Sequence, residues 1–177
     1  EQSIVIYGGR AGCTSNGLWI LIFDSETALP YNTQPGLGGK CGRLPRELVK
    51  SFSSLNNIAS QNAVIEFLNT ISENDIVLFV TCGTHYATQW GDEMKDKLRE
   101  FGANLLDDIP SDKHPYIFLG QDGNAAALSE DYGETLSDTL ILDYNLVGRL
   151  TVGVIRSPLI GPTTDWGEYS HDFSREG

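Results

Sequence analysis

The stretch Asp75-Ile-Val-Leu-Phe-Val-Thr81 decides the fold. It is a short, continuous apolar run of the kind that forms a buried strand. The preceding residues, 60–71, place apolar side chains on one stripe of a helix, with Ser60 as the candidate N-cap. A helix and a buried strand therefore lie next to each other in the chain, which is typical of a domain that packs helices against a sheet.

A second helix and a second strand follow the same run. Residues 90–103 repeat the helical pattern, with Thr88 as the candidate N-cap and Gly102 as the candidate stop. Residues 116–119 (Tyr-Ile-Phe-Leu) then form another apolar run. Because a helix links the two strands, the pattern predicts a right-handed parallel crossover between them.

Further strands are expected on either side of this block. The run Gly17-Leu-Trp-Ile-Leu-Ile-Phe-Asp24 is apolar on both faces, so we expect it between two layers, with a hairpin turn after it. Other segments with strand patterns are residues 3–7, 47–53, 139–143 and 150–155, the last two joined as a hairpin. We expect one domain over residues 1–156. Residues 157–177 read as a terminal extended segment or the joint to a following domain.

Composition and charge exclude several classes of function. The chain has 177 residues, with 24 acidic against 12 basic side chains and a formal charge of −12. Such a surface repels nucleic-acid phosphates and anionic membranes, so neither is an expected partner. No apolar run is long enough to span a bilayer. The spacing of His, Cys and acidic residues matches no zinc or calcium motif, so no metal and no cofactor are expected.

Three cysteines leave two arrangements open. Cys13 and Cys41 lie in Gly-rich segments, whereas Cys82 ends the most apolar strand. One arrangement is a disulfide between Cys13 and Cys41 with Cys82 as a free thiol, which implies an oxidising compartment. The other is three unrelated thiols in a reducing compartment.

The candidate functional residues follow the central strand. His85 and Cys82 could form a thiol and base pair, although no oxyanion-hole motif accompanies them. His85, Tyr86, Trp90 and Asp92 offer flat rings and polar anchors, which are typical of a surface that binds a sugar or a partner side chain. Trp90 could equally fill the interface between helix and sheet. Arg10 and Arg43, near the two Gly-rich loops, could recognise a carboxylate or anchor those loops by hydrogen bonds.

The pattern Val64-Ile-Glu-Phe-Leu, Asn74-Asp-Ile-Val-Leu-Phe-Val-Thr, Lys97-Leu-Arg-Glu-Phe-Gly-Ala and Tyr116-Ile-Phe-Leu-Gly-Gln-Asp-Gly resembles the interleukin-like EMT inducer domain over residues 17–128. This domain also occurs as the stem of a glycosyltransferase. The resemblance implies an α+β fold, a compact ββα sandwich of mainly antiparallel sheets flanked by short helices. The segment 157–166 is similar to one that follows this domain in large secreted or surface proteins of Bacteroidetes-type bacteria.

The resemblance also implies a role. We expect a non-enzymatic binding or interaction domain of a larger exported bacterial protein, in an extracytoplasmic setting, with glycans or other surface proteins as partners. The family's cytokine-like cysteine framework is not reproduced, and residues 112–116 depart from its pattern, so no sugar-binding residue is carried over. The alternatives are a thiol-dependent enzyme that uses Cys82 and His85, and a purely structural spacer.

Overall fold

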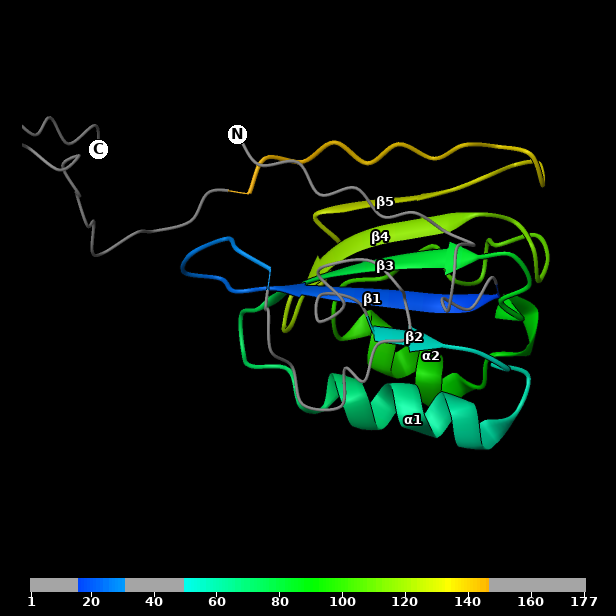
Figure 1. The fold of residues 1–177 in the computed structure, drawn as a ribbon, viewed down its shortest axis with the longest axis horizontal. Coiled ribbons are helices and arrows are strands. Elements are labelled where there is room, and N and C mark those ends of the chain that lie inside the picture. The colour runs from blue at the N-terminus through cyan, green and yellow to red at the C-terminus, as the bar shows by residue number, and fades with distance from the viewer. Residues whose placement is uncertain (1–15, 31–49, 147–177) are drawn as a thin grey trace, which may run out of the picture.

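The computed structural model describes residues 16–30 and 50–146. A five-stranded sheet lies at the centre of this part, with the strand order β2-β1-β3-β4-β5 (Figure 1). Every neighbouring pair is antiparallel. The strands are β1 (Gly17–Phe23), β2 (Lys50–Phe52), β3 (Ile76–Cys82), β4 (Tyr116–Gln121) and β5 (Ser129–Tyr132).

Both helices lie on the same side of this sheet (Figure 1). They are α1 (Ile58–Leu68) and α2 (Asp92–Arg99), and a short 3₁₀ turn, η1 (Ala87–Gln89), precedes α2. The predicted sandwich with a parallel crossover is therefore wrong. The described residues form one antiparallel sheet with its helices on one face, and they contain no parallel pair of strands.

The connection between β3 and β4 explains the missing parallel pair. This connection crosses the helix-covered face of the sheet twice. α2 runs away from the end of β3, and the loop after α2 returns to it. At the far end, the Phe101 carbonyl accepts a hydrogen bond from the Gln121 amide, near the C-terminus of β4. At the near end, the Asp112 carbonyl accepts one from the His85 amide, 2.8 Å away. Since the chain is back where β3 ended, β4 starts there and runs antiparallel.

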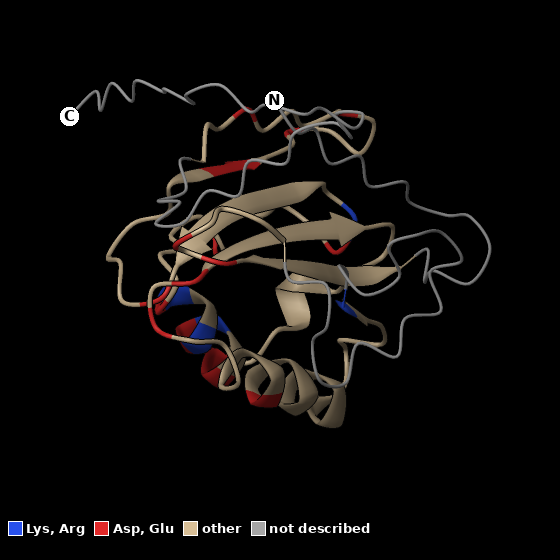
Figure 2. Ribbon diagram, turned by 60° about the vertical axis from the view of Figure 1, so that its left-hand side comes forward, with Lys and Arg blue, Asp and Glu red and all other residues tan. Residues whose placement is uncertain are grey.

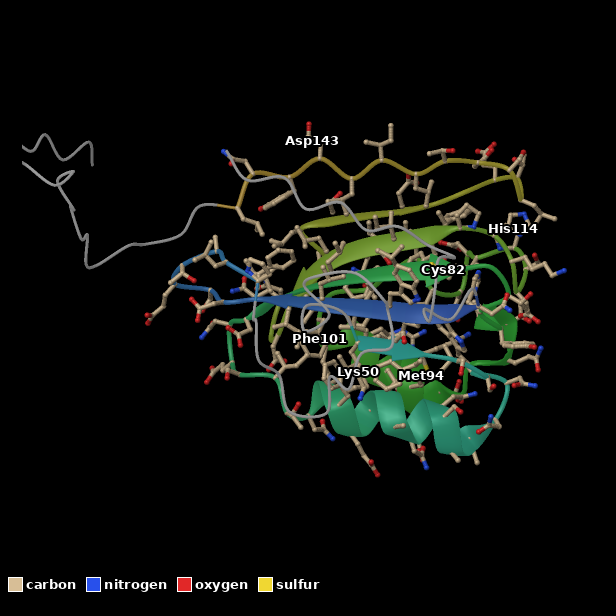
Figure 3. All side chains as sticks on the ribbon, viewed as in Figure 1. Lys50, Cys82, Met94, Phe101, His114 and Asp143 are labelled. Carbon is tan, nitrogen blue, oxygen red and sulfur yellow. The ribbon has the colours of Figure 1, made fainter. Side chains whose placement is uncertain are left out.

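The core lies between the sheet and the two helices. Phe79 and Phe118, opposite each other on β3 and β4, stack with ring centroids 4.3 Å apart. Met94 and Phe101 reach this core from the helix side (Figure 3). Every residue of β1 is buried, as its two apolar faces predicted. The layer of packed aromatic rings fixes the sheet against the helices.

The helix ends differ partly from the prediction. α1 begins earlier, because Asn57 is its N-cap and its side chain accepts the Ser60 amide at 2.9 Å. α2 begins after Gly91 rather than after Thr88. Gly102 does end this helix as predicted, at φ +96°. Its amide and that of Ala103 bond to the Arg99 and Leu98 carbonyls, which is a Schellman motif.

The turn after β1 and the outer strands agree only in part with the prediction. The turn after β1 forms as predicted, with the Asp24 carboxylate accepting the Thr27 amide and a bridge between Phe23 and Pro30. The segment 139–143 is not a strand, whereas the polar strand β5 was not predicted. The expected strands at 3–7 and 150–155, and residues 47–49 of the expected strand 47–53, lie outside the described residues.

Candidate functional site

Two loops meet at the end of the sheet where β3 stops and β4 starts. The first, residues 83–91, follows β3 and contains η1. The second, residues 111–114, leads into β4. The amides of His85 and Tyr86 donate to the Asp112 carbonyl at 2.8 and 3.4 Å. Tyr86 holds a left-handed backbone, with φ +61°, which non-glycine residues adopt only where the surroundings impose it.

The Asp112 side chain holds the two loops together. Its carboxylate accepts the Thr88 amide at 3.0 Å, the Thr88 hydroxyl, and the Gln89 side-chain amide at 2.7 Å. Partial burial alone would raise the pKa of Asp112. The hydrogen bonds from Thr88 and Gln89 outweigh it and lower that pKa. The carboxylate is thus ionised and its acceptor positions are largely used within the loops.

His85 is an interior residue rather than a surface one, with 1% of its area exposed. Its Nε2 lies 2.7 Å from the His114 carbonyl oxygen, which only accepts, so Nε2 carries the proton in the neutral ring. Its Nδ1 is buried and has no hydrogen-bond partner among the residues that the structure describes. Burial lowers the pKa of His85, against the opposing effect of that backbone hydrogen bond. A base in this position has one nitrogen occupied and the other closed to solvent.

Trp90 also lies in the interior, 4% exposed. Its Nε1 donates to the His85 carbonyl at 2.9 Å, and the two rings lie 6.0 Å apart. The indole belongs to the same buried cluster as Met94 and Leu98. Trp90 therefore packs between helix and sheet and does not offer its ring to a ligand. Of the four predicted residues in this loop and at the start of α2, Tyr86 is half-buried and only Asp92 is exposed.

Gln61, which sequence reasoning missed, fastens the same loop to α1. It is 4% exposed, and its Nε2 donates to the Leu55 and Gln89 carbonyls at 2.8 and 3.0 Å. Its Oε1 accepts the Gly91 amide at 2.8 Å, which satisfies the start of α2. Gln61 precedes Val64 by three residues, so it falls on the apolar stripe of the helix. A polar residue on that stripe was the available signal.

Cys82 and His85 are not brought together as a catalytic pair. Cys82 is a free, half-buried thiol at the end of β3 (Figure 3). Strand alternation places it on the face away from the helices, with Val80 and Leu78, whereas His85 contacts Trp90 on the helix side. Burial raises the pKa of Cys82 from 9.0 to about 11. The hydrogen bonds of the described residues include none between the Cys82 and His85 side chains.

The structure does not test four of the predicted residues. Arg10, Arg43, Cys13 and Cys41 fall outside the described residues. Within residues 16–30 and 50–146, no three His, Cys, Asp or Glu side chains are grouped closely enough to hold a metal ion. No helix in this part of the chain is both long and apolar enough to cross a bilayer.

Together these features define a small domain in which one antiparallel sheet carries two helices on one face and its strand-end loops are fastened by internal hydrogen bonds. The model of the interleukin-like EMT inducer family matches residues 16–124, which is more than half of the chain, and the protein belongs to this family. The family resemblance predicted for residues 17–128 is therefore confirmed over residues 17–124. No curated protein matches the chain.

Proposed function

We propose that this domain is a non-catalytic interaction domain of a larger exported protein. The observation that supports the proposal is that the polar groups of the two strand-end loops are hydrogen-bonded internally. The polar groups of Thr88, Gln89 and Asp112 bond to one another, and His85 is closed inside. Such loops are held rigid and have no nucleophile beside a free base, which suits a binding surface better than an active site.

The exported bacterial setting is the second part of this proposal. It is supported by the similarity of residues 157–166 to a segment that follows the domain in secreted and surface proteins. The partners on this account are glycans or other surface proteins. A thiol count of the intact chain under non-reducing conditions tests the setting, because a bridge between Cys13 and Cys41 leaves one free thiol whereas a reducing compartment leaves three.

Carbohydrate binding is the form of this proposal that can be tested directly. Among the predicted residues that the structure describes, the two with exposed area for a sugar are Tyr86, which is half-buried, and Asp92, which is exposed at the start of α2. Trp90 does not serve as a test residue, because its removal would disrupt the core. A glycan array should be probed with the intact chain, with Tyr86→Ala and with Asp92→Asn.

The matched control is Asp108→Asn, which neutralises an exposed carboxylate on another loop. Sugar binding at this site predicts a signal that Tyr86→Ala and Asp92→Asn abolish and Asp108→Asn leaves unchanged. An array on which the folded chain gives no signal removes the carbohydrate form and leaves proteins as the partners.

A further inference from the structure

The segment that follows β5 runs beside the sheet without being one of its strands. After a turn at 133–138, residues 139–146 run along the outer side of β5 (Figure 1). The turn is well fastened, because the Gly133 amide donates to the Pro115 carbonyl at 2.8 Å. The Thr135 amide also donates to the Asp138 carboxylate at 2.9 Å. The segment therefore leaves the sheet in a defined direction.

Within residues 16–30 and 50–146, the backbone of this segment has no ladder partner. From Thr139 to Leu146 no backbone amide or carbonyl is hydrogen-bonded to another residue of the described part. Yet the sequence Thr139-Leu-Ile-Leu-Asp-Tyr144 has the β-branched and aromatic composition of a strand. A strand-forming sequence with unpaired amides and carbonyls is a template for pairing with another extended chain.

The side chains of this segment alternate as a strand edge requires. Leu140 and Leu142 are half-buried, whereas Ile141 is 84% exposed. Leu136 and Tyr144, at either end, are 62% and 44% exposed. Of the five large apolar side chains exposed in the described part, these three lie within nine residues of one another. Exposed apolar groups concentrated in this way mark an interaction surface.

The charge around the segment specifies the partner. From Pro115 to Gly148 the sequence has six acidic residues and no Lys, Arg or His. Figure 2 shows acidic but no basic residues along β5 and the segment after it. Asp131, Glu134 and Asp143 are exposed, and none takes part in the salt bridges of the described residues. A second copy would bring the same acidic border against this one, and each chain carries −12, so a basic partner fits better.

We propose that Thr139–Asp143 binds an extended peptide segment of a partner protein by strand addition, and that the segment alternates apolar with Lys or Arg side chains. Main-chain hydrogen bonds supply the pairing, the apolar side chains cover Ile141, and the basic ones face Asp143 and its neighbours. This inference rests on the proposed interaction function and names its partner class.

The test uses the intact chain and a fluorescent peptide of alternating valine and lysine, with a valine and glutamate peptide as the charge control. Anisotropy titrations at low and high salt should show binding of the basic peptide only, weakened by salt. Ile141→Pro removes a ladder N–H and should weaken binding at least about tenfold. Ile58→Ala, which alters another exposed isoleucine, should leave it unchanged.

Charge reversal gives the second arm. Asp143→Lys should weaken binding of the basic peptide and reduce its salt dependence, whereas Asp108→Lys should do neither. Because Ile141 and Asp143 are exposed, thermal unfolding should show that both variants stay folded.

Two outcomes overturn the inference. One is equal binding of the basic peptide by Ile141→Pro and the unaltered chain, or no binding by either. The other is self-association that Ile141→Pro abolishes, which would make a second copy the occupant. If the peptide fails to bind while Cys82 remains unreactive in the folded chain, the partner class is wrong and the non-catalytic role stands.

Discussion

Replacing Gln61 with leucine tests how firmly α1 holds the candidate loop. Gln61 fills three hydrogen-bond roles at once, toward the Leu55 and Gln89 carbonyls and the Gly91 amide. Leucine has a similar volume and none of these groups. The substitution therefore removes the hydrogen bonds without opening a large cavity, so the change in stability reports the polar network itself.

The size of the loss in the free energy of unfolding depends on which of the former hydrogen-bond partners water can reach. The bond to the Leu55 carbonyl is buried, and a buried group that loses its partner costs about 1–3 kcal/mol. The groups of Gln89 and Gly91 are only partly buried, so each adds about 0.5 kcal/mol. We expect a loss of about 3 kcal/mol in the free energy of unfolding. For a chain of this length, that lowers Tm by roughly 6–12 °C.

Urea and thermal unfolding, followed by circular dichroism, measure the loss. Asn62→Leu is the matched control, because it makes a similar change at the next residue, which is exposed, and should alter stability by about 0.5 kcal/mol or less. A Gln61→Leu variant as stable as Asn62→Leu would refute the reasoning. It would mean that the loop between β3 and α2 does not depend on the glutamine.

Three further predictions concern the same contacts. Burial lowers the pKa of His85, so the folded chain favours the neutral ring; stability is full above the unfolded pKa near 6.5 and falls as the pH drops through the native pKa. His85→Gln should reduce the loss of stability between pH 7.5 and 5.5, as measured by urea unfolding, and an unchanged loss would contradict this. Tyr116→Phe removes a 2.6 Å hydrogen bond to Glu130 and should cost about 1–2 kcal/mol, whereas Tyr132→Phe on β5 should cost under about 0.5 kcal/mol. Equal costs in denaturant titrations would exclude a role for that bond. Gly102→Ala places a Cβ 2.4 Å from the Ala126 carbonyl carbon at φ +96°, and should cost more than about 2 kcal/mol. Gly123→Ala, at φ +81° with no atom within 4 Å, should cost only about 1 kcal/mol, and thermal unfolding that finds the two alike would remove the steric argument.

The central strands and the core could be predicted because local pattern determines them. The continuous apolar run of β3 and the two apolar faces of β1 reflect burial, which acts residue by residue. The end of α2 could also be predicted, because the left-handed position after a helix favours glycine, here Gly102. These signals are contained in a few neighbouring residues.

The strand direction could not be predicted from such signals. It depends on whether the chain between β3 and β4 crosses the sheet once or twice, and the return loop has no periodic pattern. β5 was missed because Ser129-Glu-Asp-Tyr132 is polar. Glu130 is held there by the Asn104 and Leu105 amides and the Tyr116 hydroxyl, contacts distant in sequence. The segment 139–143 was predicted as a strand from composition, which does not supply a ladder partner.

The candidate loop shows the same limit. Residues 85–92 were found because aromatic and polar residues cluster there, but sequence does not distinguish a ring that points outward from one in the core. The interior positions of His85 and Trp90 follow from packing against α2 and from the contact with His114. Asp112, the residue that joins the two loops, lies 20 or more residues from its partners and carried no local signal.

The central claim is that the strand-end site has no reactive thiol, and the alkylation rate of Cys82 tests it most directly. A pKa of about 11 lowers the thiolate fraction at neutral pH about 100-fold relative to the ordinary value of 9.0. The more basic thiolate is also more nucleophilic, which recovers about tenfold of that loss in rate. With iodoacetamide at pH 7.5, read at the Cys82 peptide by mass spectrometry, the folded chain should react at least about tenfold more slowly than the chain in urea. Faster reaction in the folded chain, with a midpoint below pH 8, would contradict the account.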